Sequence, residues 1–178
     1  DPEAYKNLMK ERKSLAPIIE KYREYKKADS DAEEAKALLD GARERIAKVF
    51  NCQSSEIYFT SCGTEADNWA IKGAAYRMRS KGRDHIVTTK IEHHAVLNTC
   101  EALEKEGFTV TYVGVDENGV IDLDELSMAV NEKTAIVSVM YANNETGSVN
   151  PVHNIGKFCR KNNILFLSDC VQAAGCHK

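Results

Sequence analysis

From about residue 41 onward, short apolar runs alternate with longer stretches in which apolar residues recur every three or four positions. The runs predict strands at 56–60, 85–89, 108–114, 134–140 and 163–168, and the periodic stretches predict helices at 65–80, 94–106, 122–131 and 151–161. The last two strand candidates are nearly continuous in apolar residues, which is typical of central parallel strands. This order predicts an α/β domain over residues 41–178, with a mostly parallel sheet of about five strands and flanking helices.

Residues 1–40 have a different pattern, because they are dense in charge and carry only a narrow apolar stripe. Asp1-Pro2 predicts a helix start, with proline at the first helical position, and Pro17 is expected to kink that helix. Ser30-Asp31-Ala32-Glu33 has the pattern of a capping box, which predicts the start of a second helix. Residues 1–40 are therefore predicted to form an antiparallel α-helical hairpin. Because so narrow a stripe buries little by itself, the hairpin is expected to dock on another surface.

Composition and charge narrow the classes of function. An apolar fraction of 43% and a charged fraction of 29% are those of a soluble globular protein. A net charge of −3 gives no reason to expect nucleic acid or an anionic membrane as a partner. No apolar run approaches the roughly 20 residues that a membrane span needs, and the charged first residues do not match a signal peptide. The six cysteines form no Cys-x-x-Cys pair, so we expect reduced thiols in a cytoplasmic protein and no zinc site.

Polar clusters follow the predicted strands at the points where ligands bind in open parallel sheets. They are Ser61-Cys62-Gly63-Thr64, Glu92-His93-His94, the Asn-Asn-Glu-Thr-Gly segment 143–147, and Asp169 with Gln172. Each cluster alone can be purely structural, as a turn, a histidine pair or a helix cap. Together they offer a phosphate site at a helix start, a flat aromatic ring, an amide donor and a carboxylate.

One further loop superficially resembles a calcium site. Asp116-Glu117-Asn118-Gly119 is a turn, and Glu125 lies at the right distance after its glycine. The first ligand position would be Gly114, which has no side chain to offer. The sequence therefore predicts no calcium site, and no other metal site.

The four clusters, taken in this order, resemble the pyridoxal-phosphate site of cysteine desulfurases, in the class V aminotransferase family. The matching stretches are Thr60–Asn68, Glu92–Val96, Asn143–Gly147 and Ser168–Ala173, and the resemblance runs from about residue 41 to residue 178. It implies a partial fold-type I aminotransferase large domain. It also implies site roles: Gly63 and Thr64 would hold the cofactor phosphate, and His93 would stack on the pyridine ring and could transfer protons. Asn144 and Gln172 would face the ring's phenolic oxygen, and Asp169 would pair with the pyridinium nitrogen.

The sequence also departs from the family. Cys62 stands where the family usually has glycine, and Leu167-Ser168 replaces the usual His-Thr before the aspartate. The family's Schiff-base lysine and persulfide-forming cysteine would lie beyond Lys178, and His177-Lys178 follows Asp169 too closely to supply that lysine. We therefore expect a cofactor-binding fragment that is not catalytically competent alone. Its family reaction transfers sulfur from L-cysteine, giving alanine and feeding iron–sulfur cluster assembly.

Residues 1–40 resemble the N-terminal helical domain of bacterial class I peptide chain release factors, through 1–5, 20–28 and 32–36. No Gly-Gly-Gln motif is present, so release activity is not implied. The two resemblances together predict a chimera joined near Leu39–Ala42. The alternative function is a non-enzymatic chimeric or engineered scaffold, or an oligomerising interaction protein. A truncated parallel sheet would expose an edge strand and apolar faces, so a homo-oligomer is expected.

Overall fold

The computed structural model describes residues 2–176, which fall into two compact units with the chain boundary between Phe59 and Thr60. The first unit is built on the helix α1 (Pro2–Phe50), followed by the short 3-10 helix η1 (Ser54–Glu56). Among residues 2–176, no helix is both long enough and apolar enough to cross a membrane.

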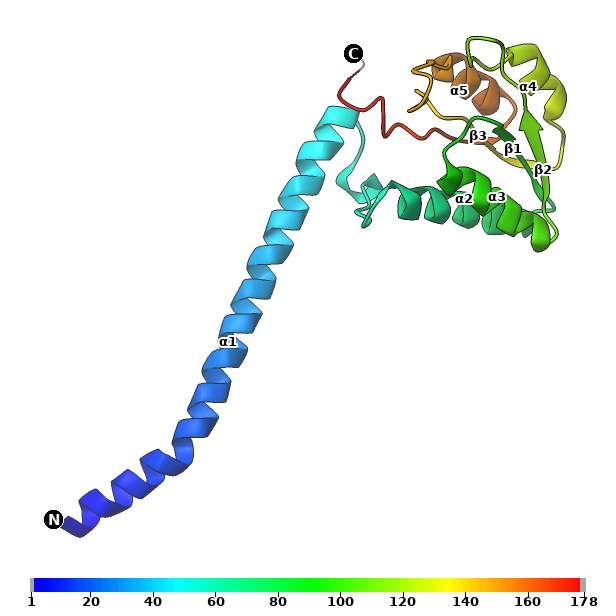
Figure 1. Ribbon diagram of the computed structural model, residues 1–178. Helices are drawn as coiled ribbons and strands as arrows, with labels where there is room; N and C mark the ends of the chain where they lie inside the picture. The colour runs from blue at the N-terminus through cyan, green and yellow to red at the C-terminus, as the bar shows by residue number, and fades with distance from the viewer. Residues whose placement is uncertain (1, 177–178) are drawn as a thin grey trace. The chain divides into compact units, whose positions relative to one another are not determined.

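The helical hairpin predicted for residues 1–40 is wrong, because α1 is a single helix of 49 residues. It continues through the capping-box segment at Ser30 and through Leu39–Ala42 without a break. Residues 26–36 contain neither glycine nor proline and are rich in Lys, Glu and Ala, so helix continuation is favourable there. Pro17 lies inside the helix, and the N-terminal part of α1 bends (Figure 1), as expected where a proline removes one helical hydrogen bond.

The strand predicted at 56–60 is also wrong. Ser54–Glu56 forms η1, and residues 57–60 are extended without belonging to any strand of the described chain. A strand is defined by its ladder of backbone hydrogen bonds, and an apolar run alone cannot supply a partner. The sheet therefore has four strands, not five.

The second unit is a three-layer α/β structure (Figure 1). Its sheet is parallel throughout, in the order β2-β1-β3-β4. Helices α2 and α3 lie on one side of the sheet, and α4 and α5 lie on the other. The elements run in the order α2 (Gly63–Arg79), β1 (His85–Thr89), α3 (His94–Lys105), β2 (Thr109–Val113), α4 (Leu123–Ala129), β3 (Thr134–Ser138), α5 (Val152–Lys161) and β4 (Leu165–Leu167). The predicted α/β fold with a parallel sheet and flanking helices is confirmed.

Alternation along the strands gives the sheet two apolar cores. Ile86 and Ile136 are register partners, and they pack with Ile71 of α2 and Leu103 of α3. Val87 and Val137, one residue further along each strand, pack on the opposite face. That second core contains the following residues of α4, α5 and the adjoining loops: Ile121, Leu126, Ile155, Cys159 and Ile164. Both β1 and β3 are buried along their whole length, as expected of the two central strands.

At the amino edge of the sheet, His85 is buried and both of its ring nitrogens are bound. Its Nδ1 lies 2.9 Å from Thr134 Oγ1, and its Nε2 lies 2.9 Å from Thr111 Oγ1. Burial lowers the pKa of His85, because a charged ring would lose hydration there. This network joins three neighbouring strands at the edge opposite the candidate site.

Candidate functional site

The sheet order brings the carboxyl ends of β1, β3 and β4 together, and the polar clusters that follow them meet at one cleft. The cleft has a volume of about 240 Å³. All six predicted site residues line it, together with four others: Gly63, Thr64, His93, Asn144, Asp169 and Gln172, then Asp67, Met140, Ala142 and Val171. The volume lies below the roughly 300–1,000 Å³ typical of drug-sized ligands, so the cleft suits a small molecule.

One wall of the cleft is the start of α2. Gly63 is the first residue of this 17-residue helix, and Cys62 is its N-cap. A Cβ atom at Gly63 would lie 3.1 Å from Val171 Cγ2, so a larger residue would push on the opposite wall. The first backbone N–H groups of a helix have no helical acceptor and attract anions. The start of α2 therefore provides a phosphate-sized anion position with glycine where space is tightest.

Two side chains modify this helix start. Glu65 Oε2 accepts hydrogen bonds from Ser61 N at 2.6 Å and from Ser61 Oγ at 2.7 Å. These bonds lower the pKa of the Glu65 carboxyl and hold the turn before α2. The backbone N–H of Glu65 and the Ser61 hydroxyl lower the pKa of the exposed Cys62 thiol. The start of α2 thus carries an exposed thiol whose pKa is lowered.

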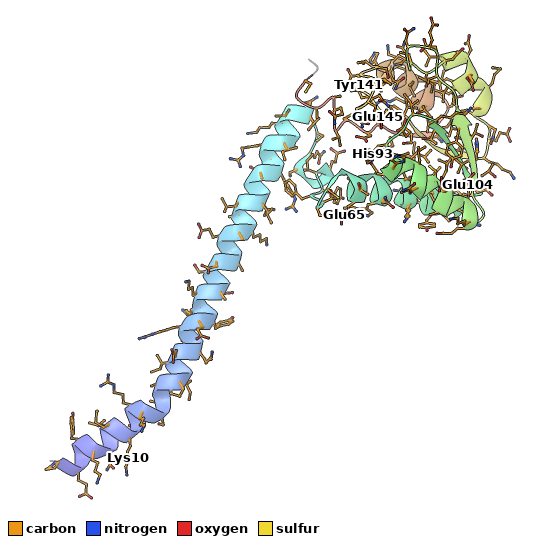
Figure 2. The ribbon with its side chains drawn as sticks, in the orientation of Figure 1. Lys10, Glu65, His93, Glu104, Tyr141 and Glu145 are labelled. Carbon is orange, nitrogen blue, oxygen red and sulfur yellow. The ribbon has the colours of Figure 1, made fainter. Side chains whose placement is uncertain are left out.

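His93 is fixed in orientation by the start of α3. It is the N-cap of that helix, and its Nδ1 accepts a hydrogen bond from Ala95 N at 3.1 Å. An accepting Nδ1 places the proton of the neutral ring on Nε2. Figure 2 labels His93 at this helix end, and it also labels Tyr141 and Glu145, which follow β3. The His93 ring is therefore held in one orientation by the backbone N–H of Ala95, as stacking on a flat ligand requires.

Asn143, beside the predicted Asn144, organises the loop after β3. Its Nδ2 donates to Ile91 O at 2.9 Å, and its Oδ1 accepts from Glu145 N at 2.8 Å and from Thr146 N at 2.9 Å. These bonds tie the loop to the segment after β1. Asn143 is buried, whereas Asn144 is exposed and lines the cleft. The first asparagine of the pair is structural, and the second is available to a ligand.

Asp169 lies just beyond β4 and is held from both sides. Tyr141 N donates to the backbone oxygen of Asp169 at 2.9 Å, which extends the pairing of β3 and β4 past the strand ends. Its Oδ1 accepts a hydrogen bond from Val171 N at 2.9 Å. The carboxylate is therefore positioned by backbone groups on the cleft wall.

The sequence analysis also considered His177-Lys178 as a possible match to the family's lysine. Both residues lie outside the described part of the chain.

Two acidic residues at or beside the site were given no role by the sequence reasoning, although Glu92 belongs to one of its polar clusters. Asp67 is only 7% exposed and lines the cleft, and Glu92 is only 5% exposed beside His93. Asp67 follows Gly63 by four residues, so helical spacing placed both on one face of α2 and could have revealed it. Glu92 could not have been found this way, because the sequence does not show that it turns into the interior.

Glu92 connects the ends of β1 and β3 from inside the protein. Its Oε1 accepts from Thr89 Oγ1 at 2.7 Å and from Met140 N at 2.9 Å, whereas its Oε2 is buried without a hydrogen-bond partner in the described chain. Burial raises the pKa of Glu92 to about 7, against the effect of these two bonds. Burial, with the charge of Asp169, likewise raises the pKa of Asp67 to about 6. The site therefore holds more carboxylates than it can ionise without cost.

The donor and acceptor set fits pyridoxal phosphate. A helix start with a close-packed glycine suits the phosphate, and a fixed imidazole suits one face of a flat ring. A carboxylate held by backbone groups, with two further acidic side chains nearby, favours a cationic ring nitrogen. The two ends of the cleft thus have opposite electrostatic preferences, as a ligand with a phosphate and a pyridinium requires.

Comparison with known proteins places this geometry in a family. The sequence profile described as "Aminotransferase class-V" matches residues 14–178. "Cysteine desulfurase IscS" of Clostridium botulinum (strain Hall) is 51% identical over 146 residues, which cover 82% of this chain and 36% of the relative. The protein of the same name from Methanosarcina thermophila is 49% identical over 141 residues, which cover 79% of this chain and 35% of the relative.

Solved structures agree with the sequence comparison. A "NIFS-like protein" aligns with a TM-score of 0.76 at 44% identity, over 80% of this chain and 39% of that structure. DndA from Streptomyces lividans aligns with a TM-score of 0.78 at 33% identity, over 82% of this chain and 40% of that structure. The chain therefore spans little more than a third of the length of the relatives it matches.

Proposed function

The chain belongs to the class V aminotransferase family, whose members depend on pyridoxal phosphate, and we propose that the cleft of its second unit binds this cofactor. One observation carries the proposal: the six residues singled out in the sequence all line a single cleft. They come from α2 and from the segments that follow β1, β3 and β4, which are distant in sequence.

At the phosphate end, Gly63 and Thr64 would supply backbone N–H groups and the Thr64 hydroxyl. The distance of 3.1 Å from a Gly63 Cβ to Val171 Cγ2 leaves no room for a larger residue there without a shift. The charge of the helix end adds a favourable field for a dianion, worth about 0.3–1 kcal/mol per exposed charge. Binding at this end would depend on shape as much as on charge.

At the ring end, His93 would stack on the pyridine and Asp169 would pair with its nitrogen. His93 keeps a fixed orientation because Nδ1 accepts from Ala95 N, which leaves the proton on Nε2 available for transfer. Asp169 uses Oδ1 to accept from Val171 N, so Oδ2 would be able to accept a hydrogen bond from the pyridinium N–H. Asn144 and Gln172 would donate to the phenolic oxygen. When bound, the cofactor supplies an electron sink for a substrate carbanion.

The family reaction points to L-cysteine as the substrate class, with sulfur transfer in a cytoplasmic setting as the process served. None of the cleft residues given above is a lysine. We therefore expect the chain of 178 residues to bind the cofactor without a covalent bond, and not to release alanine from cysteine by itself.

The proposal can be tested by titrating the chain with pyridoxal phosphate and following cofactor absorbance and Trp69 fluorescence. Trp69 is the single tryptophan and lies on α2. We expect saturable binding that borohydride does not make covalent, as mass spectrometry would show. Asp169→Asn should weaken binding at least about tenfold, because it loses the charge pair with the ring nitrogen. Asp124→Asn, on the exposed start of α4, is the matched control.

No saturable change up to about 1 mM cofactor would refute the proposed site. Equal affinity of the Asp169→Asn variant and the unchanged chain would refute the assigned role of Asp169. Steady release of alanine from cysteine would refute the expectation that the chain is inactive alone.

A second role is favoured by α1. Many of its large apolar side chains are exposed, among them Leu8, Ile18, Tyr22 and Leu38. Such a helix gains stability by pairing, so we propose that the chain forms a homo-oligomer. The release-factor-like character of residues 1–40 supports a chimeric origin for this segment, and deletion of 1–40 should leave cofactor binding unchanged if the segment is an appendage.

A further inference from the structure

The apolar residues of α1 follow a seven-residue repeat along most of the helix. Leu8, Leu15 and Tyr22 are each seven apart, and a second series, offset by three residues, is also spaced by seven: Ile18, Tyr25, Ala32, Leu39 and Ile46. Apolar residues in these two positions form the seam of a coiled coil. The seam is open, since Ile18 is 63% exposed, Tyr22 is 58% exposed and Leu39 is 49% exposed.

The polar residues on the same seam decide how a second helix can pair with it. Glu11, Asp29, Lys36 and Arg43 occupy positions of the repeat that would face a partner. In a parallel, in-register pair of identical helices, each of these residues would face its own copy. Four layers of like charges would then be partly desolvated, which is strongly unfavourable.

Reversing one helix removes this conflict. Suppose that Leu15 of one copy packs against Leu39 of a second, antiparallel copy. Tyr22 then packs against Ala32 of the second copy, and Ile18 packs against the aliphatic stem of its Lys36. In the same register, Tyr25 faces Asp29, whose carboxylate can accept a hydrogen bond from the Tyr25 hydroxyl, and Glu11 faces Arg43. We propose that α1 pairs with α1 of a second copy as an antiparallel coiled coil in this register. This inference rests on the proposed self-association and names its surface.

The distribution of charge along α1 supports the antiparallel arrangement independently. Residues 2–27 carry 8 Lys+Arg and 4 Asp+Glu, whereas residues 28–50 carry 4 Lys+Arg and 6 Asp+Glu. In the proposed register, the basic half of each helix lies along the acidic half of the other. A parallel pair would instead place basic against basic and acidic against acidic.

The central part of the helix carries the proposal. Near its C-terminal end, Arg43 bonds Asp40 Oδ1 at 2.8 Å and lies 5.3 Å from the centre of the Phe59 ring, and Ile46 is half-buried. Between Leu15 and Leu39, Lys26 Nζ lies 5.7 Å from the centre of the Tyr22 ring; this contact is within α1 itself, and Tyr22 stays 58% exposed. Pro17 lies between the seam residues Leu15 and Ile18, so most of the proposed contact, from Ile18 to Leu39, lies C-terminal to it.

The surface is tested with the full chain by light scattering and sedimentation over a concentration series. We expect a dimer, and we expect Leu39→Gln to raise its dissociation constant at least about 100-fold, because two symmetry-related Leu15 contacts are lost. Leu38→Gln is the matched control: Leu38 is 67% exposed but lies off the seam. It should leave the dissociation constant within about threefold.

Direction and register are tested by oxidative cross-linking, with the linked peptides identified by mass spectrometry. The double variant Tyr22→Cys/Ala32→Cys should give links between positions 22 and 32 of different copies, and Ala32→Cys alone should give no link between the two positions 32. The unchanged chain controls for its native cysteines. Within one helix, positions 22 and 32 lie roughly 15 Å apart, too far for a disulfide.

Each alternative gives a different result. A monomer at about 100 μM overturns both the self-association and the seam. A dimer that is equally stable with Leu39→Gln keeps the self-association and overturns the seam. Links between the two positions 32 indicate a parallel pair, and links between 22 and 32 within one chain indicate a hairpin; either overturns the proposal. None of these outcomes affects the proposed cofactor site, which lies in the other unit.

Discussion

The buried carboxyl of Glu92 makes the stability of the second unit depend on pH. Its Oε1 accepts two hydrogen bonds, whereas its Oε2 has no hydrogen-bond partner among residues 2–176 and is closed off from solvent. Ionisation therefore places a charge where water cannot reach it, with Asp67 and Asp169 close enough to raise its pKa further. The protonated form is favoured in the folded state and the ionised form in the unfolded state.

The size of this effect follows from the difference between the two states. The pKa is 4.5 for an ordinary glutamate and about 7 in the folded chain. Between these values the folded state binds a proton that the unfolded state does not, so the free energy of unfolding falls as pH rises. The total fall is about 3 kcal/mol, complete above about pH 7.5, since one pKa unit corresponds to about 1.36 kcal/mol.

We expect Glu92→Gln to remove most of this dependence. The amide oxygen can still accept from Thr89 and Met140, but the group cannot ionise. Urea unfolding, followed by Trp69 fluorescence at pH 5 and pH 8.5, measures the change. Between these two pH values the unchanged chain should lose about 2–3 kcal/mol more than the variant. At pH 5 the variant should be about 1–2 kcal/mol less stable, because its amide leaves buried donors unpaired.

The comparison between two pH values separates this mechanism from simple damage. A variant that is merely destabilised would lose the same free energy at both. Glu101→Gln, on the exposed side of α3, should follow the unchanged chain throughout. If Glu92→Gln keeps the full pH dependence of the unchanged chain, Glu92 does not ionise with a raised pKa and the reasoning fails.

Three further predictions concern the site and its surroundings. Gly63→Ala should weaken pyridoxal-phosphate binding at least about fivefold, because the new Cβ would lie 3.1 Å from Val171 Cγ2. The control is Gly73→Ala, whose Cβ would have no heavy atom within 4 Å; it should leave binding unchanged and stabilise α2 by up to about 1 kcal/mol. Cys62 should react with iodoacetamide at pH 7 at least about threefold faster than Cys176, which is also exposed, because the pKa of the Cys62 thiol is lowered; peptide mass spectrometry measures both rates, and equal rates would contradict the lowered pKa. His85→Ala should lower the free energy of unfolding by about 2–4 kcal/mol at pH 7.5 and by less at pH 5, because the contribution of the buried neutral histidine to folding is lost as pH falls below about 6.5. Cofactor affinity should stay unchanged, and a loss of affinity would contradict the separation of the two sheet edges.

Much of the second unit could be predicted from the sequence, because each of its helices and strands has a recognisable pattern of apolar residues within its own segment. The alternation of apolar runs with periodic stretches located every strand and helix after residue 60 to within a few residues. In a parallel sheet, all strands end at one edge, so polar residues after each strand must meet. That rule predicted His93, Asn144 and Asp169 at one edge, whereas Gly63 was expected there after a strand at 56–60 that does not form; the structure nevertheless brings all four into one cleft.

The sequence was less informative where an outcome depends on a partner. The run at 56–60 has the composition of a strand, yet no neighbouring strand supplies its hydrogen bonds, so it forms none. The capping box at Ser30 permits a helix start but does not force one, and the surrounding residues favour continuation. The residue pattern of a segment shows which secondary structures it can adopt. Its hydrogen-bonding and packing partners in the fold determine which of them forms.

Only the tertiary structure decided the electrostatics of the site. In the sequence, Glu92 and Glu101 are both glutamates beside or within the same helix. The fold buries the first against Thr89 and Met140 and leaves the second in water, and this burial is the main cause that raises the pKa of Glu92 to about 7. The sequence by itself predicted six of the residues that gather at the carboxyl edge of the sheet, and it did not reveal the part played there by Asp67 or Glu92. The packing of three strand ends around them determined which charges that edge can hold, because the cost of a charge depends on the distance to water.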